Sequence, residues 1–343
     1  MSTPATPTLT DLEHTAQPAG QGVPAPLPVA PPAPESGWPG RQHVLDLDDF
    51  SAAEIEYVLA TADAMKEVLR RPIKHAPALR GVTVVTLFYE VSTRTRVSFE
   101  LAAKHLGADV VNITATASSV MKGESLLDTA HTLRALGADI LVMRHSEAGA
   151  PYLVAEHVAC RVINAGDGWH AHPTQALLDL YTVRERLGRI AGLRVVIVGD
   201  ILHSRVARSA IWGFLRLGAA VTLCGPPTLL PAGALPWPVE VSYDLDRALA
   251  GADVVMALRL QRERQRAGLL PSLAEYVRRY GLTRERLARA CPDALVMHPG
   301  PMNEGVEIMP EVAYGAQSVI ADQVTNGVAV RMALLYLLGR HAA

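Results

Sequence analysis

The sequence predicts an α/β protein of two domains, each a parallel β-sheet flanked by helices, with the C-terminal helix packing back on the N-terminal domain. From residue 45 onward, short apolar runs alternate with amphipathic segments. The runs are continuously apolar, which is typical of strands buried on both faces of a parallel sheet. With 343 residues and 49% hydrophobic content, the chain is long enough for two such sheets.

Residues 1–40 differ in composition from the rest of the chain. They hold ten of the 24 prolines, no lysine or arginine, and the acids Asp11, Glu13 and Glu35. Such a segment cannot bury enough apolar surface to offset its chain entropy, so we expect a disordered, partly polyproline tail. It also lacks the basic start and the unbroken apolar stretch of a signal peptide.

The expected strands and helices follow the tail in order. The first domain, residues 41–185, contains the apolar runs VTVVTLFY, ADVVNI, ADILVM and CRVINA. The second domain, residues 186–318, contains LRVVIVGD, AAVTLC, ADVVMAL and DALVMH. Helical stretches such as SFELAAKHLG and RSAIWGFLRLG lie between them, and most end in the glycine that a helix C-cap favours. In residues 319–343, DQVTNGVAVRMALLYLLGR is a long helix whose apolar face must pack on the first domain.

Composition narrows the class of protein. The formal net charge is −2, which gives no sign of a nucleic-acid partner. The cysteines Cys160, Cys224 and Cys291 are far apart and odd in number, as expected of reduced thiols rather than a disulfide framework or a zinc site. No apolar run approaches the roughly 18 residues that span a membrane. We therefore expect a soluble cytoplasmic protein with no membrane partner.

The stretch FYEVSTRTRVSFE places arginines and hydroxyl groups at the end of the first strand of the first domain. We expect a helix to begin near Val97, directly after this cluster. In parallel sheets, ligands bind outside the carboxyl ends of the strands, and helix N-termini there favour anions. The backbone N–H groups, the hydroxyl groups and at least one guanidinium would surround a phosphate. An N-cap with solvated arginines is the simpler alternative, but it does not explain the whole cluster.

Other polar loops also follow apolar strands. Each alone has an ordinary explanation, because an arginine at a strand end is usually solvated and a buried histidine is usually a satisfied core group. Their common place at the carboxyl ends of parallel strands points instead to one site. The loops are MRHSE with Arg144 and His145, GDGWHAHPTQ with His172 and Gln175, VGDILHSRVARS with Arg205, ALRLQRERQ with Arg259 and Gln261, and the turn MHPGPMNEG.

Several of these motifs resemble those of a known enzyme family. STRTR followed by FE, then KGES, MRH, HPTQ, RLQRE and HPGP, resemble the catalytic chains of the aspartate carbamoyltransferase family, from about residue 43 to the C-terminus. The resemblance implies an enzyme that transfers the carbamoyl group of carbamoyl phosphate to the amine of L-aspartate. That reaction belongs to an early stage of de novo pyrimidine biosynthesis. No cofactor or metal is implied.

The related ornithine carbamoyltransferases share the arginine-rich loop but typically carry a cysteine after His-Pro of the glutamine motif and a later His-Cys-Leu-Pro turn. This chain has Thr174 in the first place and HPGP in the second. Charge also favours aspartate, because Arg205 and Arg259 would hold its two carboxylates and repel the side-chain ammonium of ornithine.

The resemblance implies a role for each site residue. Catalysis would need no nucleophilic side chain, only positioning and stabilisation of the charge that develops. Ser92, Thr93, Arg94 and Thr95 resemble the phosphate-binding loop, and Arg144 would reach both the phosphate and the carbonyl. Thr95, Arg144 and His172 would polarise the carbonyl. The carbamoyl amide would be held by Gln175 and the backbone carbonyls of Pro299 and Gly300, and aspartate by Arg205, Arg259, Gln261 and Lys122.

The segment ASSVMKGES is predicted to be a mobile loop ahead of a helix that starts near Leu126. A solvated lysine beside a helix cap is the simple alternative. In the resembled family the matching loop, with Ser118 and Lys122, reaches into the active site of the neighbouring subunit. The resemblance thus implies a homotrimer with shared sites. It leaves open whether the trimer works alone or joins a regulatory chain or a dihydroorotase.

Single motifs in the sequence are compatible with three other functions. A metal could be held by His170 and His172, but further ligands at suitable spacing are lacking. The stretch VIVGD from Val196 to Asp200 is similar to a dinucleotide-binding strand, but no G-x-G-x-x-G follows it. The basic run RLQRERQR could bind an acidic partner, but Glu263 interrupts it, and a solvated charged turn is the simpler explanation.

Overall fold

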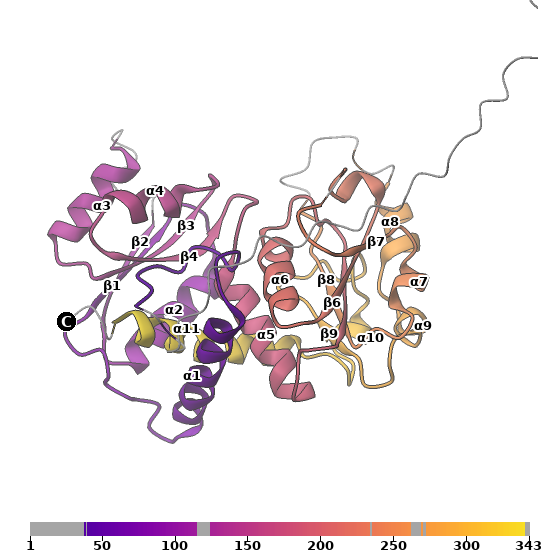
Figure 1. The fold of residues 1–343 in the computed structure, drawn as a ribbon, viewed down its shortest axis with the longest axis horizontal. Helices are drawn as coiled ribbons and strands as arrows, with labels where there is room; N and C mark the ends of the chain where they lie inside the picture. Colours follow the sequence, from indigo (N-terminus) through magenta and orange to yellow (C-terminus); the bar gives the residue numbers. More distant parts are fainter. Residues whose placement is uncertain are drawn as a thin grey trace, which may run out of the picture.

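The structure, a computed structural model, describes residues 38, 40–114, 124–233, 235–261, 269 and 272–339. It forms two lobes side by side, each with its own parallel sheet (Figure 1). The four-stranded sheet has the order β2-β1-β3-β4, and the five-stranded sheet has the order β7-β6-β5-β8-β9. All named strand pairs are parallel, so the predicted fold class is confirmed.

The first lobe follows the predicted alternation. All four predicted apolar runs form strands, and helices connect them. Its elements are α1 (Ala52–Arg70), β1 (Thr83–Phe88), α2 (Thr93–His105), β2 (Asp109–Thr114), α3 (Leu126–Ala135), β3 (Ile140–His145), α4 (Ala150–His157), β4 (Arg161–Asp167) and α5 (Pro173–Leu187).

The second lobe repeats the pattern with one additional strand. Its elements are β5 (Arg194–Val198), α6 (Arg205–Arg216), β6 (Ala220–Cys224), β7 (Glu240–Ser242), α7 (Leu245–Leu249), β8 (Val254–Ala257), α8 (Leu273–Tyr280), α9 (Arg284–Leu287), β9 (Leu295–Met297) and α10 (Pro310–Ala313). Strand β7 was not predicted. This strand has only three residues, lies at the sheet edge and is largely exposed, so it has no apolar run that could indicate it.

Local sequence explains where the helices begin and end. The side chain of Ser51 accepts the backbone N–H of Glu54, whose carboxylate accepts the backbone N–H of Ser51, which forms a capping box on α1. Helix α3 begins at Leu126, as predicted, with Ser125 as its cap. Glycines with positive φ follow four helices whose sequences end in a Leu-Gly pair: Gly107, Gly137, Gly188 and Gly218.

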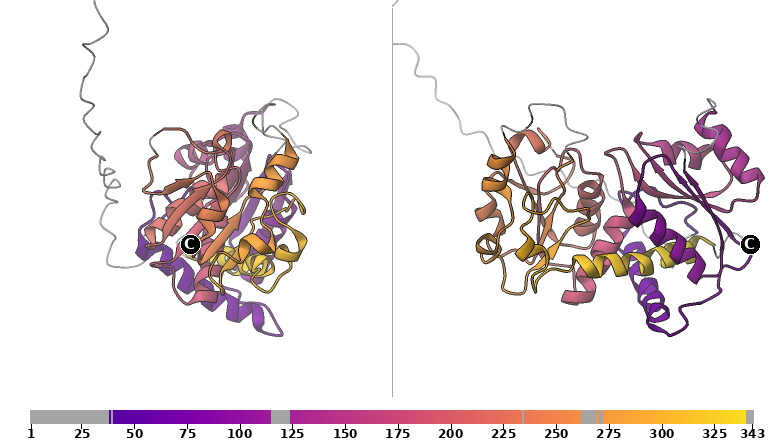
Figure 2. Two further views of the ribbon diagram at one scale, coloured as in Figure 1. Left: turned by 90° about the vertical axis from the view of Figure 1, so that its right-hand side faces the viewer. Right: turned by 180° about the vertical axis from the view of Figure 1, so that it is seen from behind.

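The C-terminal helix α11 (Ile320–Gly339) starts under the second lobe and runs back to the first, where it packs on α1, α2 and α5 (Figure 2). Most of its side chains are buried, which explains its apolar sequence. The prediction that it returns to the first lobe is confirmed. The largest apolar core includes residues from α1, α5, α6 and α11 and from both sheets, so it is continuous between the lobes. A shared core of this kind fixes the loops of one lobe opposite those of the other.

Candidate active site

A cavity of about 520 Å³ lies at the carboxyl ends of the strands and is lined by residues from both lobes. In the first sheet, β1 has β2 on one side and β3 on the other, so the chain reverses direction across the sheet at β1 and β3. The same reversal occurs at β5 and β8 of the second sheet. Ligands bind at such switch points in parallel sheets. The loops after β1, β5 and β8 line the cavity together with Arg144 near the end of β3, and the cavity is therefore the candidate active site.

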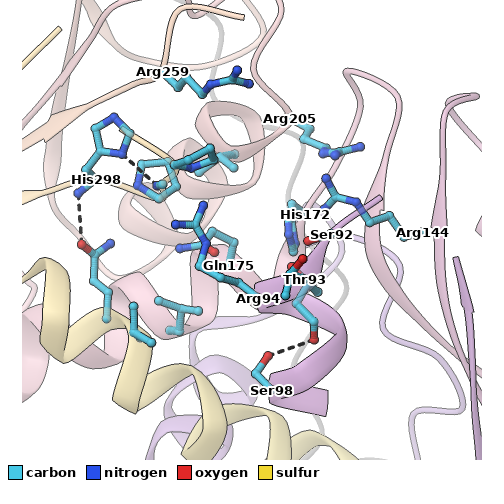
Figure 3. A pocket seen from close by; sticks show the side chains of 18 of the residues that line it. Ser92, Thr93, Arg94, Ser98, Arg144, His172, Gln175, Arg205, Arg259 and His298 are labelled. Atoms are coloured by element: carbon cyan, nitrogen blue, oxygen red, sulfur yellow. Dashed lines mark hydrogen bonds between the residues drawn. The ribbon is translucent and has the colours of Figure 1, made fainter. Parts of the chain in front are cut away.

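The N-terminus of α2 faces the cavity (Figure 3). The helix begins at Thr93, so the expected start near Val97 was wrong by one turn. Ser92 is the N-cap residue, with extended backbone angles, and its side chain makes no capping hydrogen bond. The first helical turn leaves backbone N–H groups without intrahelical acceptors, and the helix dipole is positive there. This end of α2 is consequently suited to bind an anion.

Arg94 extends from that turn to the opposite side of the cavity. Its guanidinium fills the space that a Cβ at Gly300 would occupy, and Gly300 has a φ of +66°. Glycine at this position therefore permits both the turn and the close approach of the arginine. Burial, together with the charge of Arg259, lowers the pKa of Arg94. Two cations that face a common cavity create a strongly positive potential in which an anionic ligand is stabilised.

Arg144, at the end of β3, and Arg205, the first residue of α6, meet at the carboxylate of Glu90. The distance from Arg144 Nη2 to Glu90 Oε1 is 2.9 Å. Gly166 in β4 makes room for both arginines, because a Cβ there would lie 2.9 Å from Arg205 Nε and 3.2 Å from Arg144 Nη1. Glu90 is the only carboxylate among the described residues that line the cavity. It holds two cationic side chains, one from each lobe, in a fixed orientation.

His172 is the N-cap residue of α5 and is almost entirely buried. Its backbone N–H donates to Ser209 Oγ at 2.9 Å, and Ser209 in turn donates to the buried carboxylate of Asp46. Burial, together with the charges of Arg144, Arg205 and Arg331, holds the pKa of His172 well below its ordinary value. The imidazole is therefore neutral, and its N–H can donate to a polarised oxygen without adding a further cation to the cavity.

Gln175 lies in the first turn of α5 and lines the cavity. Its Nε2 donates to Asp179 Oδ1 at 3.0 Å, and the same oxygen accepts from Gln323 Nε2 at 2.7 Å. Gln323 belongs to α11, so the carboxylate links two helices. Burial raises the pKa of Asp179 to about 7, against the lowering effect of these hydrogen bonds and of Arg331.

The turn from His298 to Pro301 follows β9 and contains a cis peptide bond between Gly300 and Pro301. His298 Nδ1 accepts the N–H of Gly300 at 2.8 Å, so the proton of the neutral ring lies on Nε2, 3.2 Å from Glu307 Oε1. The backbone N–H of His298 donates to Gln323 Oε1 at 3.0 Å. This network holds Pro299 and Gly300 at the wall of the cavity.

Arg259 and Gln261 follow β8 and line the cavity from the second lobe. The strand ends at Ala257, so the two residues belong to the loop beyond it. Leu260 between them is buried, which turns its two neighbours to the same side. The remainder of the basic run, residues 262–266, lies outside the described residues.

Comparison with known proteins identifies the family. Residues 42–185 match the family described as "Aspartate/ornithine carbamoyltransferase, carbamoyl-P binding domain", and residues 191–338 match "Aspartate/ornithine carbamoyltransferase, Asp/Orn binding domain". A protein named "Aspartate carbamoyltransferase catalytic subunit" from Roseiflexus castenholzii is 68% identical over 302 residues, which cover 87% of this chain and 95% of the relative. The chain belongs to the aspartate/ornithine carbamoyltransferase family.

Other members of this carbamoyltransferase family are similar in sequence or structure. The catalytic subunit from Pelotomaculum thermopropionicum is 62% identical over 295 residues, covering 86% of this chain and 96% of that protein. The aspartate transcarbamoylase of Trypanosoma cruzi, solved with carbamoyl phosphate and aspartate, superposes with a TM-score of 0.80 at 30% identity and covers 87% and 96% of the two chains. The ornithine carbamoyltransferase of Pyrococcus furiosus gives 0.78 at 30% identity, with coverage of 88% and 97%.

The candidate site of this family member gathers every described residue to which the resemblance assigned a role. All of them line the one cavity: Ser92, Thr93, Arg94, Thr95, Arg144, His172, Gln175, Arg205, Arg259, Gln261, Pro299 and Gly300. Ser118 and Lys122 lie outside the described residues, as does most of the proline-rich tail. His145 does not line the cavity, and its ring lies against Tyr89 with ring centroids 4.6 Å apart.

Some cavity residues were not found by sequence reasoning. Glu90 lies inside the quoted stretch FYEVSTRTR, but a carboxylate was not expected in an anion site. Arg331 is buried in α11 over the ring of Phe99, and burial lowers its pKa to about 10. The signal for Arg331 was an arginine within an otherwise apolar helix, because charged residues are rarely buried without a purpose.

Two of the alternative interpretations concern residues that the structure describes. His170 is paired with Asp167 at 3.1 Å, and no group of three or more His, Cys, Asp or Glu side chains suited to a metal occurs in the described parts of the chain. Gly199 of VIVGD has a φ of +127°, and a Cβ there would lie 3.0 Å from the carbonyl oxygen of Leu258. This glycine thus allows the loop after β8 to approach. Within the described ranges, no helix is both long and apolar enough to cross a bilayer.

Proposed function

We propose that this protein transfers the carbamoyl group of carbamoyl phosphate to the α-amine of L-aspartate, giving N-carbamoyl-L-aspartate and phosphate in the pyrimidine pathway. The observation that carries the proposal is the convergence of Arg94, Arg144, Arg205 and Arg259 from both lobes on one cavity. Two substrates that together carry a phosphate dianion and two carboxylates need such a set of cations. The names of the curated relatives and of the Trypanosoma cruzi enzyme support the choice of aspartate.

The first lobe, residues 41–185, would bind carbamoyl phosphate. In this proposal Ser92, Thr93, Arg94 and Thr95 donate to the phosphate from the start of α2, and Arg144 reaches the phosphate and the carbonyl oxygen. The position of these groups around the cavity supports the assignment. The amide of the substrate would donate to Gln175 and to the carbonyl groups of Pro299 and Gly300.

The second lobe, residues 186–318, would bind aspartate. Arg205 and Arg259 supply guanidinium groups to the two carboxylates, and Gln261 supplies an amide. Lys122, from outside the described residues, is assigned to the same substrate. The C-terminal segment, residues 319–343, is assigned to the first lobe, and its helix α11 brings Arg331 to the cavity.

The reaction follows from this placement. The aspartate amine attacks the carbonyl carbon and forms a C–N bond, while the carbonyl π electrons move to oxygen. Thr95, Arg144 and the neutral His172 donate hydrogen bonds to the resulting oxyanion, whose charge they stabilise. The carbonyl is then restored, the bond to the phosphate oxygen breaks, and the departing phosphate takes a proton from the former amine. No step needs a nucleophilic side chain, a metal or a cofactor.

We also propose a homotrimer in which Ser118 and Lys122 complete the site of a neighbouring subunit. The exposed edge strand β2, with Val111 46% exposed, supports an interface on this side of the first lobe. Mixing an Arg94→Ala chain with a Lys122→Ala chain should restore activity, because one intact site can be assembled from two damaged chains. No recovery after verified subunit exchange would contradict shared sites. A regulatory chain or a dihydroorotase would bind such a trimer as a further partner.

Phosphate release from carbamoyl phosphate, measured with L-aspartate and with L-ornithine in parallel, tests the reaction. We expect turnover with aspartate and none with ornithine, and mass spectrometry should identify carbamoyl aspartate. Turnover with ornithine would contradict the assignment of Arg259 and Gln261. A protein that turns over neither amine would contradict the proposed function unless the trimer had failed to assemble, which sedimentation would reveal.

A further inference from the structure

Asp179 lies one turn after Gln175 on α5 and has no exposed surface. Its Oδ1 accepts hydrogen bonds from the side-chain amides of Gln175 and Gln323. Gln175 lines the cavity, while Gln323 supports the turn that begins at His298. One carboxylate oxygen therefore contacts both Gln175 and Gln323, which form or hold the cavity wall to which the carbamoyl amide is assigned. Asp179 itself does not line the cavity.

The hydrogen bonds fix the orientation of both glutamine amides. Gln323 Oε1 accepts the backbone N–H of His298, and a backbone N–H can only donate, so Gln323 Nε2 must be the atom that faces Asp179. Asp179 Oδ1 is thus an acceptor. The same oxygen accepts from Gln175 Nε2, which leaves Gln175 Oε1 available to the cavity. A rotated Gln175 amide would place two oxygens against each other at 3.0 Å and is disfavoured.

We propose that Asp179 is a positioning residue that turns hydrogen-bond acceptors toward the substrate on the amide-binding side of the cavity. It presents Gln175 Oε1 to the substrate and, through Gln323 and His298, holds the carbonyl groups of Pro299 and Gly300. The inference rests on the proposed function. Its consequence is selectivity among acyl phosphates, because acceptors bind an NH₂ group but gain nothing from a methyl group of similar size.

The property that matters is hydrogen-bond acceptance rather than charge. Asp179 Oδ2 has no hydrogen-bond partner among the described residues, so a proton can be bound there without disturbing the two bonds at Oδ1. An asparagine whose Oδ1 replaces that of Asp179 would accept the same two bonds. Leucine has a similar shape and accepts none. The pair Asp179→Asn and Asp179→Leu therefore separates positioning from mere filling of space.

The experiment compares carbamoyl phosphate with acetyl phosphate, which carries a methyl group in place of NH₂. Dissociation constants of both, and of inorganic phosphate, are measured by calorimetry on the wild-type protein and on folded variants. In Asp179→Leu, affinity for carbamoyl phosphate should fall about tenfold or more, with acetyl phosphate and phosphate unchanged within about twofold. Asp179→Asn should recover most of the lost affinity. If Asp179→Leu does not fold, Asp179→Ala, which leaves room for water, replaces it, with a smaller loss expected.

Two controls separate this role from a structural one. Thr182→Val removes another buried hydrogen bond between α5 and α11, the 3.0 Å bond from Asn326 Nδ2 to Thr182 Oγ1, but touches neither glutamine. It should lower thermal stability and leave the ratio of the two acyl phosphate affinities unchanged. In a Gln175→Leu background, Asp179→Leu should cost far less affinity than it does alone, because Asp179 acts largely through Gln175.

The outcomes are distinct. Equal weakening of carbamoyl and acetyl phosphate, or no weakening of either, would overturn the inference. So would full additivity of Asp179→Leu and Gln175→Leu, or an Asp179→Asn chain as impaired as Asp179→Leu. Failure of the wild-type chain to bind carbamoyl phosphate at all would instead overturn the proposed function, so the two failures can be told apart.

Discussion

Glu90 and Arg205 form a bidentate ion pair, with Glu90 Oε2 2.9 Å from Arg205 Nη1 and Oε1 2.8 Å from Nη2. Glu90 follows β1 of the first lobe, and Arg205 begins α6 of the second. The Arg205 side chain is only 4% exposed, so this contact is shielded from solvent and binds the lobes together at the cavity. The same carboxylate pairs with Arg144, and Glu90 therefore aligns one arginine assigned to each substrate.

Replacement of Glu90 by glutamine should separate alignment from charge. The variant Glu90→Gln removes the cavity's carboxylate, so kcat should fall about tenfold or more because Arg144 and Arg205 lose their common partner. Inorganic phosphate should bind as tightly as before or more tightly, because the cavity becomes more positive. Steady-state kinetics and phosphate inhibition constants measure both effects. Glu67→Gln, in an exposed pair on α1, is the control, and a weaker phosphate affinity in Glu90→Gln would contradict the argument.

Loss of the Arg94 guanidinium should mainly weaken the binding of carbamoyl phosphate. The variant Arg94→Ala should lower the affinity for carbamoyl phosphate and for inorganic phosphate about 100-fold, because a charge-assisted contact at the start of α2 disappears. Equilibrium binding of both anions provides the measurement. Arg96→Ala is a matched control, since Arg96 Nη1 donates to Thr114 Oγ1 at 3.4 Å and Arg96 does not line the cavity. Phosphate affinity that survives in Arg94→Ala would place the phosphate elsewhere.

Arg259 should serve the second substrate. The variant Arg259→Ala should raise the KM for aspartate about 100-fold and change carbamoyl phosphate binding less than about threefold, because the Arg259 guanidinium is assigned to a carboxylate of aspartate. Kinetics at saturating carbamoyl phosphate and calorimetry with carbamoyl phosphate alone give the two quantities. Arg279→Ala on α8 is the control, since that side chain is 62% exposed. Equal weakening of both substrates would refute the division of the lobes between them.

Sequence reasoning located the cavity residues because it needed only strand ends. The carboxyl ends of parallel strands meet at one edge, so Arg144, Arg205 and Arg259 could be placed together without coordinates. It could not find contacts that depend on how helices pack. The role of Asp179 could not be found because its hydrogen-bond partner Gln323 lies on another helix, 144 residues away in the sequence. The start of α2 was misplaced because its first turn, from Thr93 to Arg96, is entirely polar and carries no apolar periodicity that could indicate a helix.

The buried carboxyl of Asp179 should leave a signature in the pH dependence of stability. Burial raises its pKa from 3.8 to about 7, so between these values the folded state binds more protons than the unfolded state. The contribution of this group to stability is fully present below pH 3.8 and is lost as pH rises through about 7. Asparagine does not titrate. The free energy of unfolding of the wild-type protein, minus that of Asp179→Asn, should therefore fall as pH rises from about 4 to about 7, by an amount on the order of 4 kcal/mol, and should level off above pH 8.

Urea denaturation of both chains at a series of pH values measures this difference. Subtraction removes the contributions to the free energy of unfolding from groups that the two chains share, including the buried His172. His172 acts with the opposite sign. Its lowered pKa makes the folded state bind fewer protons than the unfolded state, so both chains lose stability together as pH falls below about 6.5. A difference that stays constant between pH 4 and pH 8 would show that Asp179 is ionised throughout, and that Arg331 outweighs the cost of its burial.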